Sequence, residues 1–437
     1  FHTHRWLFTF VLVEMACQLA LLFPSLAGAR VLIRSAAFGG SAALVVVLRG
    51  GRWEHSHPSL PAAAIALVVM AVSIANPNTN ALTAGIATVV LNIAILGPIV
   101  WAPRIRIDAG VIRKLLLLFW GFNTLSAVFG ALQMYFPGRF QPAIASILAD
   151  RTNYLQSLHI TLANGARVYR PMGLTDTPGG AGLGGVYSVL FGSAFLSERP
   201  RPWQRAILLA GMAVGLFALY LSQVRCYVVV LAIGLVAMAA PYVVQRRTAR
   251  FMTILTAVGA VGIVGFVLAV AVGGDAVTRR LSTLLNGDPG QVYYSNRGTF
   301  LEDTIYNLVP QYPLGAGLGR WGMISTYFGD LRNPLSRPLW AEIQWTGWLY
   351  DGGVPLMLVY LAAMLIAVRE ILGIAARRDP GSRELHPWAC AIFGYSVGMV
   401  ALTFNCCPFE TTVGLDFWLL NAALFAASRQ AIASPGS

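Results

Sequence analysis

Long apolar segments follow one another along almost the whole 437-residue sequence, and they constrain the fold more than any other feature. A helix of about 20 apolar residues is long enough to cross the hydrocarbon core of a bilayer. Hydrophobic residues make up 57% of the chain and charged residues 11%, which excludes an ordinary soluble domain. The sequence therefore predicts an all-α polytopic integral membrane protein, a single transmembrane domain over 1–437 with about twelve transmembrane helices. The expected spans are 6–27, 31–48, 60–75, 81–101, 115–136, 180–197, 206–221, 226–244, 251–272, 343–367, 387–404 and 412–428.

Basic residues gather in alternate loops between these segments, and this pattern predicts the orientation of the chain. Cytoplasmic loops hold an excess of Arg and Lys, so both termini are expected in the cytoplasm. The same residues account for most of the formal net charge of +13, so that charge does not indicate nucleic-acid binding. The basic groups are Arg49 and Arg52; Arg104, Arg106, Arg113 and Lys114; Arg199, Arg201 and Arg205; Arg246, Arg247 and Arg250; and Arg369, Arg377, Arg378 and Arg383.

This orientation leaves two long loops outside the membrane, at 137–178 and at 273–342 between the ninth and tenth spans. Loops of this length in a compact protein are usually functional or disordered, so function is expected there. The second loop contains SNRGTFLEDTIYNLVP, in which Ser295 or Asn296 is expected to cap a short amphipathic helix. Arg297 would lie in the first turn of that helix. A cation there opposes the helix dipole, which favours an anionic partner.

Arg225 stands between two apolar segments, within YLSQVRCYVVVLAIG at 220–234. Burying a guanidinium in a membrane costs several kcal/mol unless a negative group meets it. Arg170 and Arg297 fall on the same outer side, and Glu342 lies at the outer end of the tenth span. The pattern favours an outer site for an anionic ligand. The alternative for Arg225 is a structural role, anchoring a helix end at the membrane interface.

Other polar motifs predict no site of their own. His55 and His57 form an HxH in a loop without further nearby ligands, which favours a solvated loop over a metal site. The five cysteines indicate neither a disulfide framework nor a metal site. Glu14 and Asp416 are intramembrane acids without a matching partner visible in the sequence, and they are interpreted as packing or helix-positioning groups. The glycine-rich PQYPLGAGLGRWG lacks the strand and acidic residue of a nucleotide loop, so we expect a tight turn that brings backbone close to a ligand or the membrane.

Four motifs in order, covering about 165–365, resemble those of the O-antigen ligase and Wzy-type polysaccharide polymerase superfamily, which are GT-C-like integral membrane glycosyltransferases. They are YRPMGLTDTPGGAG, YLSQVRCYVVVLAIG, SNRGTFLEDTIYNLVPQYPLGAGLG and AEIQWTGWLYDGGVP. Where ligases of this superfamily carry a histidine, this chain has Glu342, and Ile343 and Gln344 stand where an asparagine is expected.

The resemblance implies a metal-independent glycosyltransferase without a cofactor, located in the bacterial inner membrane with its active site facing the periplasm. Such an enzyme transfers an oligosaccharide from undecaprenyl diphosphate to the hydroxyl of an acceptor glycan. Glu342 in place of histidine favours a polymerase over an O-antigen ligase that transfers the glycan to lipid A core. A lipid-linked oligosaccharide flippase is the alternative from another class. The implied partners are the lipid-linked donor, the bilayer, the acceptor glycan and a chain-length regulator protein.

The resemblance also implies roles for individual residues. Arg225 and Arg297 would hold the diphosphate and stabilise the charge that develops on it. Glu342 would be the general base that takes the proton of the acceptor hydroxyl, with His159 in the first outer loop as the alternative base. Further contacts to the diphosphate or the sugar are expected from Arg170, Arg320 and Tyr294.

Overall fold

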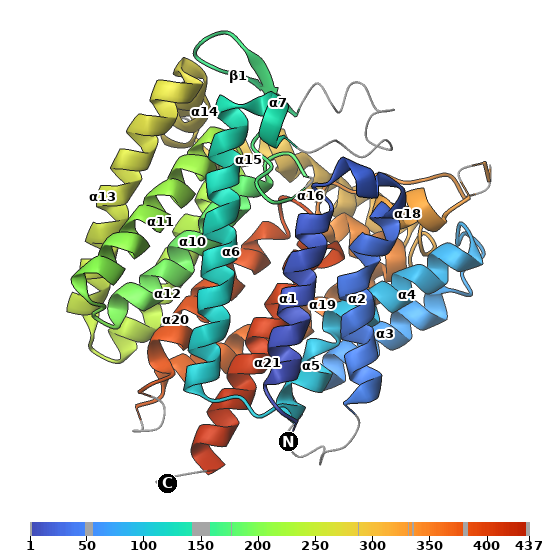
Figure 1. Ribbon diagram of the computed structural model, residues 1–437. Coiled ribbons are helices and arrows are strands. Elements are labelled where there is room, and N and C mark those ends of the chain that lie inside the picture. The colour runs from blue at the N-terminus through green and yellow to red at the C-terminus, as the bar shows by residue number, and fades with distance from the viewer. Residues whose placement is uncertain are drawn as a thin grey trace.

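The protein is almost entirely helical in its computed structural model, and several helices have the length and apolar character of membrane spans (Figure 1). The structure describes residues 2–48, 56–141, 158–175, 177–286, 288–330, 332–333, 336–378 and 383–433. In these residues seven helices are long and apolar enough to cross a bilayer. They are α2 (Arg30–Val47), α6 (Ala109–Tyr135), α10 (Gly180–Ser197), α11 (Pro202–Ser222), α12 (Arg225–Val244), α13 (Thr248–Gly273) and α19 (Gln344–Ala376).

Every apolar segment expected from the sequence contains a helix. An eighth candidate span joins α4 (Leu82–Leu96) to the segment Pro98–Arg104, with a bend of 42° between them. That segment is composed of α5 (Pro98–Trp101) and η3 (Ala102–Arg104). The remaining expected spans correspond to α1 (Arg5–Ala20), α3 (Leu60–Ser73), α20 (His386–Leu402) and α21 (Thr412–Ala433). The all-α polytopic architecture is thus found, while the number of twelve spans stays a prediction.

Helix α10 occupies the centre of the bundle, where it packs against α6, α11, α12 and α20. Its sequence begins GAGLGG, and the small residues let neighbouring backbones approach closely. A Cβ on Gly185 would lie 2.3 Å from the carbonyl oxygen of Gly215 on α11, so glycine is required at this crossing. Fourteen of the 18 residues of α10 are buried, which explains why the helix is apolar on all sides.

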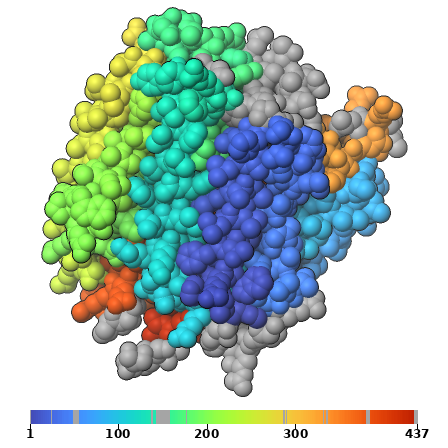
Figure 2. Space-filling view, in the orientation of Figure 1, coloured from blue at the N-terminus to red at the C-terminus, as the bar shows by residue number. Residues whose placement is uncertain are grey.

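The β-hairpin and α14 (Asp275–Asn286) lie at one end of the molecule, and both termini lie at the opposite end (Figure 1). A hairpin of β1 (His159–Thr161) and β2 (Arg167–Tyr169) pairs antiparallel, with His159 opposite Tyr169. In the space-filling view this green hairpin region covers the upper ends of α6 and α13 (Figure 2). The end of the molecule that carries the hairpin is called the hairpin end below.

Helix α19 is interrupted at Gly352 and Gly353. Gly353 has φ +67°, and neither glycine has helical backbone angles. The loop that contains PLGAGLG fills the break: Ala316 N–H donates to the Tyr350 carbonyl at 2.8 Å, and Val354 N–H donates to the Pro313 carbonyl at 3.0 Å. The backbone groups released by the kink are therefore satisfied within the protein.

The glycines of this loop approach the chain's own backbone, and this corrects the expected approach to a ligand or the membrane. A Cβ on Gly317 would lie 2.4 Å from the carbonyl carbon of Asn78, in the turn between α3 and α4. The Asn76 amide donates to the Gly315 carbonyl at 3.1 Å and secures the same contact. The glycine-rich loop is thus a packing element between two helical regions.

Two polar residues that the sequence singles out are buried, which agrees with a packing role for Asp416 and contradicts a solvated loop at His57. Asp416 has a partner, because the Tyr187 hydroxyl donates to it at 2.8 Å and also bonds the Tyr395 hydroxyl at 2.7 Å. The Glu14 carboxyl lies next to Asp416, 402 positions away in the chain. His57 is not solvated: its side chain is completely buried, bonds Ser59 Oγ at 2.7 Å and packs on Phe425.

Candidate active site

The helical segment that carries Arg297 begins earlier than the sequence analysis predicted. It starts with α15 (Pro289–Tyr293), where Asp288 caps the first turn by accepting from the Gly290 N–H at 2.8 Å. The expected caps Ser295 and Asn296 lie inside the helical segment, so that prediction is wrong. The segment continues through η4 (Tyr294–Gly298), α16 (Thr299–Asp303), η5 (Thr304–Leu308) and α17 (Val309–Gln311).

Arg297 lies in η4, which is a π-helical turn, and not in a first α-helical turn. A second π turn follows at η5. Such turns are rare and frequently occur at functional sites, because they change the direction in which a side chain points. The Thr304 hydroxyl of η5 bonds the Thr346 hydroxyl of α19 at 2.6 Å, which fixes this segment against the start of α19.

Glu342 lies just before α19 and pairs with Arg297. Arg297 Nη1 contacts Glu342 Oε2, and the Trp340 indole N–H donates to Glu342 Oε1 at 2.8 Å. The two paired side chains are 35% and 21% exposed, so a ligand can reach both of them. The Arg297 guanidinium also lies over the Phe300 ring, 5.8 Å from its centroid. The structure thus brings together two of the predicted catalytic residues.

Arg225, the first residue of α12, faces the same segment. Its guanidinium donates to Thr283 Oγ1 at 2.9 Å and to Asn296 Oδ1 at 2.7 Å. Asn296 directly precedes Arg297, so the hydrogen bond joins Arg225 to the helical segment of the ion pair. Both acceptors are neutral, and Arg225 forms no ion pair with any residue that the structure describes. An anionic ligand would supply the negative charge that the described residues do not provide for Arg225.

Arg280 is a member of this cluster that the sequence analysis missed. It lies on α14 (Asp275–Asn286), the same helix as Thr283. Desolvation lowers the pKa of the Arg280 guanidinium, and the positive charges of Arg225 and Arg170 lower it further. Arg170 and Arg297 in turn both lie within electrostatic range of Cys226, the second residue of α12. We call Arg170, Arg225, Arg280 and Arg297 the arginine cluster.

Charge repulsion makes such a cluster costly unless anions compensate it. Arg297 pairs with a carboxylate, whereas Arg225 and Arg280 form no ion pair with any described residue. Guanidinium groups bind phosphate oxygens through paired hydrogen bonds and stay charged when partly buried. The arrangement can therefore bind a multiply charged phosphate group beside one carboxylate, Glu342.

Three other predicted site residues have different surroundings. Arg320 is 7% exposed and donates to the carbonyls of Ala316 and Arg337, which gives it a structural role in its own loop. Tyr294 is exposed and its hydroxyl bonds Glu302, which raises the pKa of Tyr294. The His159 ring packs on Tyr169, with ring centroids 3.9 Å apart.

Two cysteines line the site without indicating thiol chemistry. Cys406 and Cys407 lie close enough to Arg297 and Glu342 to interact with both charges. Burial raises the pKa of both thiols, which disfavours the thiolate that a nucleophile or metal ligand requires. No group of three or more His, Cys, Asp or Glu side chains that could hold a metal ion occurs in the described ranges.

A scan against protein-family models finds no match for this chain, and a search of curated proteins finds no significant match either. The interpretation of the site therefore depends on its residues and their geometry.

Proposed function

We propose that the protein is a membrane glycosyltransferase that uses a polyprenyl-diphosphate-linked oligosaccharide as its donor. The observation that carries the proposal is the arginine cluster at one end of a membrane-type helical bundle, beside the carboxylate of Glu342. A diphosphate at the level of the lipid headgroups carries several negative charges, and Arg225 and Arg280 have no carboxylate partner in the described chain. The resemblance of four sequence motifs to polysaccharide polymerases and ligases supports the same assignment.

The proposal includes a topology of twelve spans in the bacterial inner membrane, with both termini in the cytoplasm. The hairpin end then faces the periplasm. The positions of the termini in Figure 1 support this, because both lie at the end opposite the hairpin. The alternation of basic loops along the sequence supports the same orientation.

In the proposed reaction, the acceptor hydroxyl oxygen attacks the anomeric carbon of the donor sugar. A new glycosidic carbon–oxygen bond forms, and the bond from that carbon to the diphosphate oxygen breaks. The diphosphate leaves with the electron pair, and its charge is stabilised by Arg225, Arg280 and Arg297. The proton of the acceptor hydroxyl passes to a general base.

Glu342 is the proposed base because it is the carboxylate at the cluster and is already oriented. Its two oxygens accept one contact each, from Arg297 and from Trp340. A carboxylate offers about four lone-pair positions, so each oxygen keeps the capacity to accept a proton. His159 is the second candidate, since its strand partner in the hairpin, Tyr169, directly precedes Arg170.

A polymerase is favoured over a ligase because a carboxylate stands where related ligases carry histidine. Under this proposal the acceptor is another lipid-linked repeat unit, and a chain-length regulator is an expected partner. A flippase would move the same lipid without breaking a covalent bond. It would need the arginine cluster for binding but would have no use for a base.

The decisive experiment uses the purified full chain with undecaprenyl-diphosphate oligosaccharide as donor and acceptor. We expect longer lipid-linked glycans and free undecaprenyl diphosphate in stoichiometric amounts. Product formed only when lipid A core is added would assign a ligase. Movement of the lipid across liposomes without release of undecaprenyl diphosphate would assign a flippase and contradict the proposal.

A further inference from the structure

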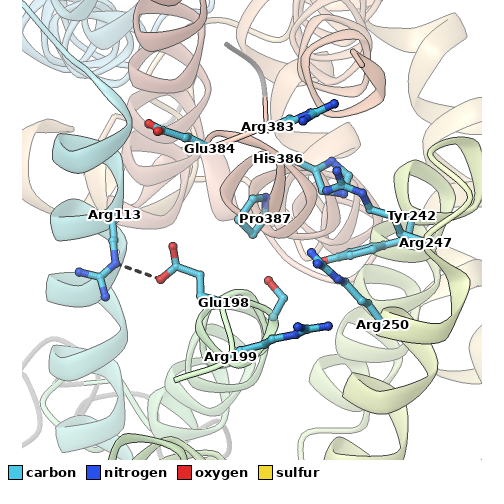
Figure 3. Close-up of a pocket in the computed structure, with 11 residues that line it drawn as sticks. Arg113, Glu198, Arg199, Tyr242, Arg247, Arg250, Arg383, Glu384, His386 and Pro387 are labelled. Atoms are coloured by element: carbon cyan, nitrogen blue, oxygen red, sulfur yellow. Dashed lines mark hydrogen bonds and ion pairs between the residues drawn. The ribbon is translucent and has the colours of Figure 1, made fainter. Parts of the chain in front are cut away.

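A polar pocket lies at the opposite end of α12 from Arg225, at the end of the molecule that carries both termini (Figures 1 and 3). Its volume is about 470 Å³. Helix α12 has 20 residues, so it separates the pocket from Arg225 by about 30 Å, the thickness of a bilayer core. The lining residues are Arg113, Ser197, Glu198, Arg199, Tyr242, Arg247, Arg250, Arg383, Glu384, His386 and Pro387.

The pocket carries an excess of positive charge, with five arginines and two glutamates in its lining. Glu198 is already neutralised by Arg113 at 3.0 Å. Figure 3 shows this pair on one side of the hollow and Arg247 and Arg250 across from it, while the Arg199 side chain begins beside Glu198 and extends toward Arg250. None of those three arginines forms an ion pair within the ranges that the structure describes.

A buried hydroxyl in the lining indicates more than a loop that orients the chain in the membrane. The side chain of Tyr242 is 1% exposed, and its hydroxyl has no hydrogen-bond partner of ordinary geometry in the described chain, although Ser197 lies nearby. A buried hydroxyl without a partner at the wall of a polar pocket suits a ligand oxygen.

The surface beside the pocket is apolar. Val243 and Val244 at the end of α12 are 57% and 46% exposed, and Met252 on α13 is 55% exposed. In a bilayer, acyl chains would cover these side chains, directly next to the arginines. Arginines that bind phosphate, a buried hydroxyl donor and an adjacent lipid-facing surface are the complement of an anionic phospholipid.

We propose that this pocket binds the phosphate headgroup of an anionic phospholipid of the leaflet at the termini end. The three unpaired arginines hold the phosphate oxygens, Tyr242 donates a hydrogen bond, and the acyl chains lie along Val243, Val244 and Met252. This site is independent of the glycosyltransferase proposal, because it lies at the other end of α12 and shares no residue with the arginine cluster.

The test measures lipid binding by the purified full chain, by native mass spectrometry and by the thermal shift on adding lipid. Phosphatidylglycerol and cardiolipin are the probes, phosphatidylcholine is the neutral lipid, and inorganic phosphate and glycerol phosphate are the soluble anions. We expect binding of the anionic lipids over phosphatidylcholine, and an affinity about tenfold lower in the double variant Arg247→Ala, Arg250→Ala. The matched control is Arg205→Ala, an exposed arginine on α11 outside the pocket lining, which should bind as the wild type does.

A second variant separates headgroup binding from membrane orientation. Arg247→Lys with Arg250→Lys keeps the positive charges that orient the chain but loses the paired hydrogen bonds of guanidinium. We expect weaker lipid binding with unchanged topology and unchanged folding. Wild-type affinity in both double variants would overturn the proposal. Saturation by glycerol phosphate at the same concentration as the lipid would also overturn it and would assign a soluble ligand.

Discussion

Glu342 contacts Arg297 through one carboxylate oxygen and accepts the Trp340 indole N–H through the other. A partly exposed ion pair of this kind contributes little to stability, at most about 1 kcal/mol. Its consequence is orientation: the carboxylate and the guanidinium are held at fixed positions before any substrate binds.

Replacing Arg225 or Arg297 by alanine should abolish polymer formation. Arg225→Ala and Arg297→Ala each remove a guanidinium from the proposed diphosphate site, while expression and membrane insertion should stay intact. Arg225→Lys should restore little activity, because an ammonium cannot donate the same paired hydrogen bonds. Polymer yield in isolated membranes is the measurement.

Arg280 and Arg279 provide a matched comparison for the same prediction. Arg280→Ala should lower the polymer yield, because Arg280 lies with Arg225 and Arg170. Arg279→Ala, its neighbour on α14, should leave the yield unchanged. Near-normal polymer from Arg225→Ala or Arg297→Ala would remove that residue from the site.

Glu342→Gln should lower the transfer rate by about 10²–10⁴, the usual contribution of a positioned general base. The glutamine can still accept a hydrogen bond from Trp340 but cannot take up a proton, so donor binding should change little. Glu342→His should keep partial activity, because imidazole also accepts protons near neutral pH. The turnover rate and the donor affinity must be measured separately.

His159→Gln is the companion variant for the choice of base. Its ring packs on Tyr169, so we expect a moderate loss at most if Glu342 is the base. An active Glu342→Gln protein together with an inactive His159→Gln protein would move the base to the hairpin.

Removal of divalent cations should leave turnover unchanged. In the proposed site, arginines meet the charge on the departing diphosphate, so the mechanism assigns no role to Mg²⁺. Turnover in excess chelator, compared with turnover in added magnesium, is the measurement. Activity that disappears in chelator and returns with magnesium would contradict the arginine-based account.

Gly353→Ala should destabilise the protein by about 2 kcal/mol or more, through a left-handed backbone and a steric clash. Gly353 has φ +67°, and a Cβ there would lie 2.2 Å from the Pro313 carbonyl oxygen. Gly373→Ala in the same helix is the control, because no atom lies within 4 Å of its Cβ position. That control should be neutral or stabilising by about 0.5–1 kcal/mol. The measurement is the unfolding midpoint of each variant in detergent. Equal midpoints for Gly353→Ala and Gly373→Ala would contradict the requirement for glycine at the kink.

His57 should make the protein less stable in mild acid. Burial lowers the pKa of His57 from 6.5 to about 3, and its Nε2 has no hydrogen-bond partner in the described chain. The unfolded chain therefore takes up a proton below pH 6.5 that the folded protein does not. The contribution of the neutral, buried His57 to the free energy of unfolding is therefore complete above pH 6.5. It is lost as the pH falls toward 3, by about 1.4 kcal/mol per pH unit. The unfolding midpoint of the wild type should fall between pH 7.5 and 5, and the fall should shrink in His57→Asn.

The sequence could predict where helices lie, because membrane spans require long apolar segments. The segment 180–197 was expected and α10 spans Gly180–Ser197, while 226–244 corresponds to Arg225–Val244. The start of the segment that carries Arg297 was also readable: Asp288 followed by Pro289 is a frequent N-cap and first-turn pair. The interpretation of Ser295 or Asn296 as the cap overlooked that signal.

Contacts between distant parts of the chain could not be predicted in the same way. Asp416 and Tyr187 belong to different spans, and a single apolar sequence contains no signal for their pairing. Arg280 follows another arginine in a polar helix and looks like a solvated surface residue. Only the folding of α14 against α12 brings it to Arg225 and Arg170.

The two π turns around Arg297 have a consequence for changes in chain length. A π turn contains one residue more than the α-helical turn that it replaces, and each residue rotates an α-helix by about 100°. Deleting one residue from Tyr294–Gly298 would restore regular helical periodicity and rotate Arg297 away from Glu342, with every charge still present in the protein. The site thus depends on residue count in this segment as much as on residue identity, and single-residue deletions or insertions here should be as damaging as loss of the arginine.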